Sequence, residues 1–239
     1  MSKAVTKTKK KAVAKKAVTK KVAAKKVVKK APAPKKVAVK KVAIKKAARK
    51  KRITVMVAST VYNNRDLLLQ VCGMLNTYGY DVVNSEYGTL HPPLGQNNTA
   101  ACIAAVNDCD IFFGLINPFY STGITHLEFQ EAIRINKPRR YMAHSFVTFS
   151  RKLLEQFMYT GVRKKRRTPF VIQRTSVMDD IRVIDMYNDA VQQNLDYADR
   201  KYHWVQEFFR YDDVFRHVQT LFADYKRVES ELDNLNNLP

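Results

Sequence analysis

A single carboxylate, Glu128, lies close in the sequence to hydroxyl and amide side chains that follow short apolar runs. Ser59 and Thr60 come directly after one such run, and Asn117 comes after another. The segment 123–132 has the apolar spacing of an amphipathic helix, with Glu128 in its first or second turn. If the two runs are parallel strands, these groups meet at the carboxyl edge of a sheet, where α/β proteins bind ligands.

The start of the same predicted helix adds two groups to this edge. Gly123 offers a backbone N–H and Thr125 a hydroxyl, and the positive end of a helix favours an anion. A structural interpretation stands beside the functional one. A glutamate in the first turn of a helix is favoured by the helix dipole without any catalysis, and Ser-Thr after a strand is a common turn or cap.

The periodicity of apolar residues predicts the elements that would position these side chains. Runs at 53–58, 80–85, 111–116 and 140–146 are short and apolar, as buried strands are. Helical spacing of apolar residues separates each run from the next. We therefore expect an α/β fold, with a parallel sheet of about four to five strands and flanking helices.

Several chemistries are excluded by the absence of their motifs. The chain has no GxGxxG after its first predicted strand, no phosphate-binding GxxxxGK[ST] and no GxSxG nucleophile elbow. The five histidines form no HxxxH or HExxH pair, so we predict no metal site. We also expect no cofactor. Cys72, Cys102 and Cys109 lie at apolar positions of predicted helices and are expected to be reduced core thiols.

Residues 1–52 differ in composition from the rest of the chain. They hold 23 of the 43 lysines and arginines and no acidic residue, which leaves 20 basic and 21 acidic residues for the remaining chain. Lysine, alanine and valine dominate, and no aromatic residue occurs before Tyr62. Such a polycation cannot bury enough apolar surface to offset the entropy of ordering, so we expect a disordered tail.

The tail is expected to bind a polyanion without reading its sequence, because lysines neutralise phosphates and nothing in the tail can contact bases specifically. Its composition resembles the C-terminal tails of linker histones and the histone-like proteins of bacteria, which implies non-specific DNA binding. A solubilising tail, a nuclear import signal and an acidic membrane surface are alternatives. The contacts are expected from paired lysines: Lys15, Lys16, Lys20, Lys21, Lys25, Lys26, Lys40, Lys41, Lys45 and Lys46.

The remainder of the chain resembles a known group of domains. The segments VMVASTVYNNRDLL and CDIFFGLINPFYSTGITHLEFQEAIRINKP, in 53–146, are similar to uncharacterised bacterial TIR-like domains. Those domains are related in turn to nucleoside 2-deoxyribosyltransferases and TIR-domain NAD hydrolases. The resemblance implies a flavodoxin/TIR-like sheet. It also implies an N-glycosidic bond of NAD or a nucleoside as the substrate, so that NAD or a nucleotide is consumed and not held as a cofactor.

The resemblance also implies roles for individual residues. Glu128 would attack or stabilise the anomeric carbon, because the transition state of glycosidic cleavage resembles an oxocarbenium ion. Tyr62 and Tyr120 would stack on a base or nicotinamide ring. The ribose and phosphates would lie against the loops that hold Ser59, Thr60, Asn117, Gly123 and Thr125.

Residues 151–239 are predicted to be an extension of the core domain 53–150. Aromatic and aliphatic residues recur from Trp204 to Tyr225 at alternating spacings of four and three, which predicts one long C-terminal helix. Its aromatic stripe either packs on the body or forms a helical seam between subunits. The basic cluster 163–167 is either a solvated loop or a second polyanion contact.

Three classes of function therefore stay open. The first is an N-glycosidase or glycosyl transferase held on DNA by the tail. The second is a nucleotide sensor or protein-interaction module on DNA, and the third is an architectural, histone-like protein. A homo-oligomer and a cytoplasmic, nucleoid-associated or nuclear location are further expectations. No apolar run of about 18 residues occurs, so we expect no membrane span.

Overall fold

The computed structural model describes residues 51–60, 64–161, 165–166, 170 and 173–237. Several sequence-based expectations lie outside these residues. They are the tail up to residue 50 with all of its paired lysines, the aromatic residue Tyr62 and most of the basic cluster 163–167.

Strands and helices alternate along most of the chain, as the periodicity predicts. The strands are β1 (Thr54–Ser59), β2 (Asp81–Val83), β3 (Ile111–Ile116), β4 (Arg139–His144), β5 (Tyr159–Thr160), β6 (Lys165–Arg166) and β7 (Val205–Phe208). The helices are α1 (Arg65–Thr77), α2 (Asn98–Asp108), α3 (Ile124–Arg134), α4 (Ser145–Met158), α5 (Arg182–Ala190), a 3-10 turn η1 (Tyr197–Asp199), α6 (Tyr211–Phe222) and α7 (Tyr225–Asn236).

Five parallel strands form one sheet in the order β2-β1-β3-β4-β7. The chain leaves β1 for β2 on one side and later returns to pair β3 on the other side of β1. β5 and β6 pair antiparallel in a separate two-stranded ribbon. The α/β class and the predicted number of strands are thus confirmed, and the order reverses at β1 and β3.

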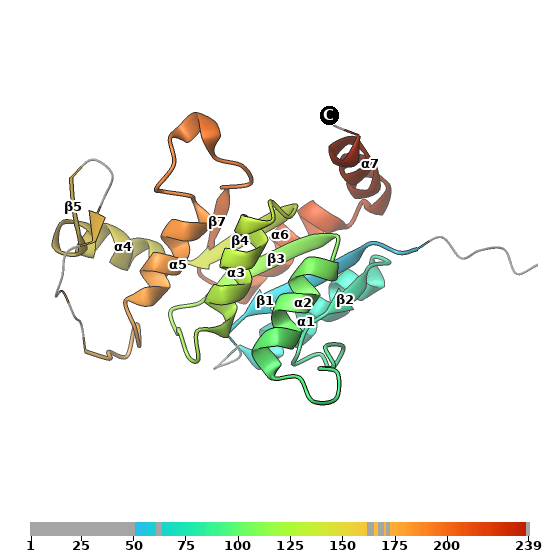
Figure 1. Ribbon diagram of the computed structural model, residues 1–239, viewed down its shortest axis with the longest axis horizontal. Helices are drawn as coiled ribbons and strands as arrows, with labels where there is room; N and C mark the ends of the chain where they lie inside the picture. The colour runs from blue at the N-terminus through green and yellow to red at the C-terminus, as the bar shows by residue number, and fades with distance from the viewer. Residues whose placement is uncertain (1–50, 61–63, 162–164, 167–169, 171–172, 238–239) are drawn as a thin grey trace, which may run out of the picture. The chain divides into compact units, whose positions relative to one another are not determined.

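Two hydrophobic cores cover the two faces of the sheet, because successive side chains of a strand point to opposite faces. Val55 and Val57 of β1 pack with α1, α6 and α7, whereas Met56 and Ala58 pack with α2, α3, α4 and α5. Figure 1 shows α2, α3 and α5 side by side over one face of the sheet. The sheet is therefore covered on both sides, as parallel sheets are.

A glycine in β3 sets how closely α3 approaches the sheet. A Cβ atom at Gly114 would overlap the ring of Phe129 on α3 and lie 2.8 Å from the ring of Tyr141 on β4. Those two rings stack at a centroid distance of 4.8 Å. Gly114 thus lets Phe129 lie flat on the strand, which fixes the helix that carries Glu128.

The carboxylate of Asp110 has the structural role that its place before β3 suggests. Its Oδ2 accepts a hydrogen bond of 2.8 Å from the backbone N–H of Thr54, at the start of β1. This contact lies at the amino edge of the sheet. Asp110 therefore aligns the two central strands at the edge opposite the predicted site.

The prediction of one long C-terminal helix is wrong. Trp204 precedes a strand, β7, which pairs with β4, and the helical part is divided into α6 and α7. Asp213 begins α6 by accepting hydrogen bonds from the backbone N–H groups of Phe209 and Arg210. Asp224 caps α7 by accepting from Arg227 N. The aromatic spacing therefore extends across β7, α6 and α7. Most of the buried residues of these three elements belong to the core on one face of the sheet.

Candidate functional site

A pocket of about 360 Å³ opens at the carboxyl edge of the sheet, where the strand order reverses. Ligands bind at this place in doubly wound sheets, since the loops after adjacent strands diverge there. The end of β1, the residues after β2, α2 and the start of α3 all line it. Its volume lies within the range of roughly 300–1,000 Å³ that is usual for small-molecule sites.

The hydroxyls after β1 enter this pocket as predicted from the sequence. Ser59 Oγ accepts a hydrogen bond of 2.7 Å from Asn117 Nδ2, which ties the end of β1 to the residue after β3. Thr60 also lines the pocket, and its buried Oγ1 has no hydrogen-bond partner among the described residues. Burying a hydroxyl without a hydrogen-bond partner costs folding free energy, so the hydroxyl of Thr60 is available to hydrogen-bond a ligand.

Glu128 lines the same pocket from the second turn of α3, with only 6% of its surface exposed. Burial raises the pKa of its carboxyl to about 7, and a hydrogen bond with the thiol of Cys102 acts weakly in the opposite direction. The helix dipole acts mainly in the first turn, where α3 carries no acidic residue. Dipole stabilisation at the helix start therefore does not account for Glu128.

Cys102 is a hydrogen-bond partner of this carboxyl. It lies on α2, lines the pocket and is buried, and burial together with the charge of Glu128 raises the pKa of its thiol to about 12. The thiol is thus protonated at neutral pH and donates to the carboxylate. No lysine, arginine or histidine is among the described residues that line the pocket, so these residues leave the negative charge of Glu128 without a cation.

The loop before α3 needs a glycine at position 123 because of its positive φ and the nearby ring of Tyr120. Gly123 has a φ of +81°, and a Cβ atom there would lie 2.9 Å from the ring of Tyr120. As the N-cap, Gly123 supplies no side-chain cap to the helix. Ser121, Thr122 and Thr125, on either side of it, line the pocket. The uncapped positive end of α3 therefore faces this cavity.

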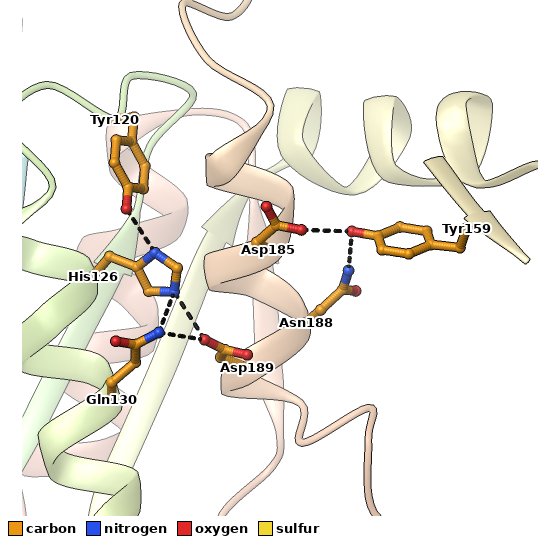
Figure 2. Close-up of polar contacts among 7 residues, drawn as sticks. All are labelled: Tyr120, His126, Gln130, Tyr159, Asp185, Asn188 and Asp189. Atoms are coloured by element: carbon orange, nitrogen blue, oxygen red, sulfur yellow. Dashed lines mark hydrogen bonds and ion pairs between the residues drawn. The ribbon is translucent and has the colours of Figure 1, made fainter. Parts of the chain in front are cut away.

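Tyr120 does not line the pocket, so the structure does not place its ring where a ligand base would stack. Its hydroxyl lies 2.8 Å from Nδ1 of His126, and Nε2 of that imidazole lies 2.9 Å from a carboxylate oxygen of Asp189 on α5. Figure 2 shows Tyr120 and Asp189 on opposite sides of the His126 ring, with Gln130 beside the carboxylate. His126 thus joins the loop before α3 to α5 and lies outside the pocket lining.

The structure brings together some of the predicted site residues and separates others. Ser59, Thr60, Thr125 and Glu128 line one cavity, while Asn117, Gly123 and Tyr120 support its walls. The sequence-based reasoning missed several lining residues: Asn84, Ser85, Asn98, Cys102, Ser121 and Thr122. The first two directly follow β2, so the same carboxyl-edge rule could have found them. No sequence signal marks Cys102, because its role depends on α2 lying beside α3.

Asn84 is a structural part of this wall. Its Nδ2 donates to Val57 O at 2.8 Å, and its Oδ1 accepts from Tyr87 N at 2.9 Å. These bonds hold the loop after β2 against β1. Leu90 and Pro92 of the same loop then cover the cavity with apolar surface.

Within the described part of the chain, no group of three or more His, Cys, Asp or Glu side chains could hold a metal ion. None of the described helices is both long enough and apolar enough to cross a membrane.

The sheet order and the pocket at its reversal define a doubly wound, flavodoxin-like α/β domain. The chain belongs to the family described as "Domain of unknown function (DUF4062)", whose model matches residues 54–220. It is similar to a solved structure titled as a conserved protein from Enterococcus faecalis V583, with 12% identity and a TM-score of 0.34. That match covers 71% of this chain and 99% of the other. No curated protein matches the chain.

Proposed function

We propose that the pocket binds a nucleoside-type molecule and that Glu128 promotes cleavage of its N-glycosidic bond. The observation that carries this proposal is a buried carboxyl in a cavity lined by hydroxyls, with no basic side chain among the lining residues that the structure describes. A resemblance to TIR-like NAD hydrolases and deoxyribosyltransferases points to the same chemistry. The candidate substrates are NAD and deoxynucleosides.

The electrostatics of the pocket suit this reaction. As the C–N bond breaks, its electron pair leaves with the base and positive charge develops on the anomeric carbon and ring oxygen. A carboxylate without a cationic partner in the lining gains most from such a charge, because the surroundings are poorly solvated. With a carboxyl pKa of about 7, a large fraction of Glu128 is ionised at neutral pH. Water or a second acceptor then captures the sugar.

The other pocket residues support binding of a sugar. The unpartnered hydroxyl of Thr60 and the hydroxyl of Thr125 are available for ribose hydroxyls. The start of α3 suits an anionic group such as a phosphate. The apolar residues of the pocket, among them Leu90 and Pro92, offer a surface for a base.

The test is release of nicotinamide from NAD, or of free base from deoxynucleosides, by the purified full chain. We expect turnover that falls by at least ~10²-fold in Glu128→Gln, a typical loss for a group that acts on the transition state. Glu131→Gln, on the same helix but outside the pocket lining, is the matched control and should keep full activity. Turnover that is equal in wild type and Glu128→Gln would refute the catalytic role. Ligand-induced stabilisation without turnover would indicate a nucleotide sensor.

The lysine-rich tail is proposed to hold this domain on DNA without sequence preference, which would place the protein on the nucleoid. The support is its charge, since 23 basic residues and no acidic residue occupy 1–52. Affinity for duplex DNA should fall by ~10³-fold or more between 50 and 200 mM salt if six or more phosphates are neutralised. Removal of residues 1–50 should abolish binding in a mobility-shift assay. Equal binding by the truncated chain would refute this proposal.

A further inference from the structure

Helix α4 has two apolar stripes, although a helix on the surface of a domain needs only one. The inner stripe faces one of the two cores of the sheet: Val147, Leu154 and Met158 are apolar, and Ser150 between them is a small, buried polar residue. The outer stripe repeats the same spacing one residue earlier. Its members are exposed to solvent: Phe146 by 40%, Phe149 by 65%, Leu153 by 57% and Phe157 by 49%.

Polar contacts fix α4 to α5, so the outer stripe lies on a helix whose position is set by the rest of the domain. The hydroxyl of Tyr159, just after α4, donates to Asp185 and accepts from Asn188, both on α5 (Figure 2). Arg151 Nε donates to Oδ1 of the same Asn188 at 2.6 Å. These bonds anchor α4 to α5, so its backbone need not move when the outer face is covered. The ring of Phe157 stacks on that of Phe170 at a centroid distance of 6.2 Å, so a partner at this end of the stripe also meets Phe170.

The exposed apolar surface continues beyond α4. Phe209, between β7 and α6, is 59% exposed, and its ring centroid lies 6.1 Å from that of Phe146. At about 150–250 Å² per aromatic side chain, the four phenylalanines leave roughly 400 Å² of aromatic surface in water. Shallow grooves run beside the stripe, one lined by Phe146, Phe149 and Glu207 and the other by Leu153 and Gln156. A patch of this size with a polar rim is typical of an interaction surface.

The spacing of the stripe points to a second copy of this chain as the occupant. Phe149 and Phe157 lie four residues on either side of Leu153, which is about 6 Å along the helix in each direction. When two copies of α4 pack antiparallel about Leu153, each Phe149 meets Phe157 of the partner subunit. A surface that matches itself after a twofold rotation is what a symmetric dimer requires.

The area agrees with this choice. Two copies together would bury at most roughly 800 Å² of phenylalanine surface, if Phe209 is covered as well as the three on α4, before Leu153 and the polar rim are added. Specific interfaces bury about 1,000 Å² or more in total. We propose that the outer stripe of α4 is a homodimer interface, with the two helices antiparallel and the twofold axis at Leu153.

Cysteine cross-linking tests this arrangement directly. The native thiols Cys72, Cys102 and Cys109 are buried, so a cysteine placed in the stripe is the reactive one. Under mild oxidation, Leu153→Cys should give a disulfide-linked dimer, because the two copies of residue 153 meet on the axis. Phe149→Cys alone should stay uncross-linked, while a mixture of Phe149→Cys and Phe157→Cys should cross-link. Efficient cross-linking of Phe149→Cys alone would overturn the antiparallel arrangement.

Sedimentation of the uncross-linked full chain provides the second measurement. The wild-type chain should be a dimer at micromolar concentration, and Leu153→Asp should be a monomer that keeps the native circular-dichroism spectrum, since residue 153 faces solvent. Its melting temperature should no longer depend on protein concentration, because no association remains to stabilise the fold. Leu94→Asp is the control, because Leu94 is 105% exposed in the loop before α2, outside this surface. A monomeric wild type, or a dimer that survives Leu153→Asp, would overturn the proposal. A DNA-free sample is needed, since a shared DNA molecule would mimic a dimer.

Discussion

The imidazole Nε2 of His126, on α3, lies 2.9 Å from a carboxylate oxygen of Asp189, on α5. The other ring nitrogen of His126 lies 2.8 Å from the hydroxyl of Tyr120. One side chain thus connects two helices and the loop whose neighbouring residues, Ser121 and Thr122, line the pocket. His126 is buried, so both of its nitrogens depend on these protein partners.

Replacement of His126 by alanine should therefore destabilise the fold by about 1–3 kcal/mol, because it leaves Tyr120 and Asp189 without their shared partner. Denaturant unfolding would measure this loss, with His91→Ala in an exposed loop as a neutral control. A double-mutant cycle with Asp189→Asn should give a coupling of about 1 kcal/mol or less, because Asp189 is partly exposed. Additive effects of the two substitutions would show that the pair does not interact.

Replacement of Gly123 by alanine should cost more stability than replacement of Gly88, although both have a positive φ, +81° and +75°. A new Cβ atom at Gly88 has no heavy atom within 4 Å, so that variant reports only the backbone strain of about 1 kcal/mol. At Gly123 the Cβ also meets the ring of Tyr120 at 2.9 Å. The difference between the two unfolding free energies isolates this contact. It should shrink when Tyr120→Ala is combined with Gly123→Ala, and a difference that persists would contradict the explanation.

The core of the fold could be predicted from the sequence because its strands are buried on both faces. Runs such as 111–116 consist of apolar residues throughout, and the structure places β3 at the predicted residues. The segment after 200 could not be read in this way. β7 is four residues long and pairs only with β4, so this tertiary pairing decides its conformation against a helical spacing. Asp213 and Asp224 accept backbone hydrogen bonds at the starts of α6 and α7. Aspartates at these positions are typical of helix starts, so the sequence does indicate two separate helices.

The candidate site was predictable where it follows from strand ends and not where it follows from helix packing. Ser59 and Thr60 end β1, and parallel strands bring such residues to one edge. The contact between Cys102 and Glu128 arises because α2 packs on α3, which periodicity alone does not specify. The resemblance implied a stacking role for Tyr120, whereas the structure places its hydroxyl 2.8 Å from Nδ1 of His126.

The three cysteines should be unreactive in the folded protein. All three are buried, and burial raises the pKa of the Cys72 and Cys102 thiols to about 12 and that of Cys109 to about 11. Since the thiolate is the reactive form, a colorimetric disulfide reagent should titrate no thiol in native buffer and three thiols in denaturant. Fast reaction of one thiol in native buffer would show that the pocket around Cys102 opens. Cys102→Ala would then identify that thiol.

The buried carboxyl of Glu128 should make the fold less stable as the pH rises. Its pKa is raised by burial from 4.5 to about 7, so the folded chain holds a proton between these values that the unfolded chain has lost. Stability therefore falls as the pH increases from about 4.5 to about 7 and levels off above, where the carboxylate is ionised in both states. A shift of this size corresponds to about 3 kcal/mol.

Glu128→Gln removes this cost because the amide stays neutral. The variant should match the wild type near pH 4.5 and exceed its unfolding free energy by up to about 3 kcal/mol at pH 8, measured by urea unfolding at several pH values. Glu131→Gln is a control of opposite sign, because a hydrogen bond from Arg134 lowers the pKa of the Glu131 carboxyl. Glu131→Gln should have a lower unfolding free energy than the wild type at neutral pH and the same unfolding free energy in acid, where the Glu131 carboxyl is protonated. If Glu128→Gln and the wild type differ equally at every pH, the carboxyl is not held in a desolvated site. A stabilising Glu128→Gln that also abolishes turnover would show that the pocket loses stability in order to keep a buried carboxylate without a cationic partner for its ligand.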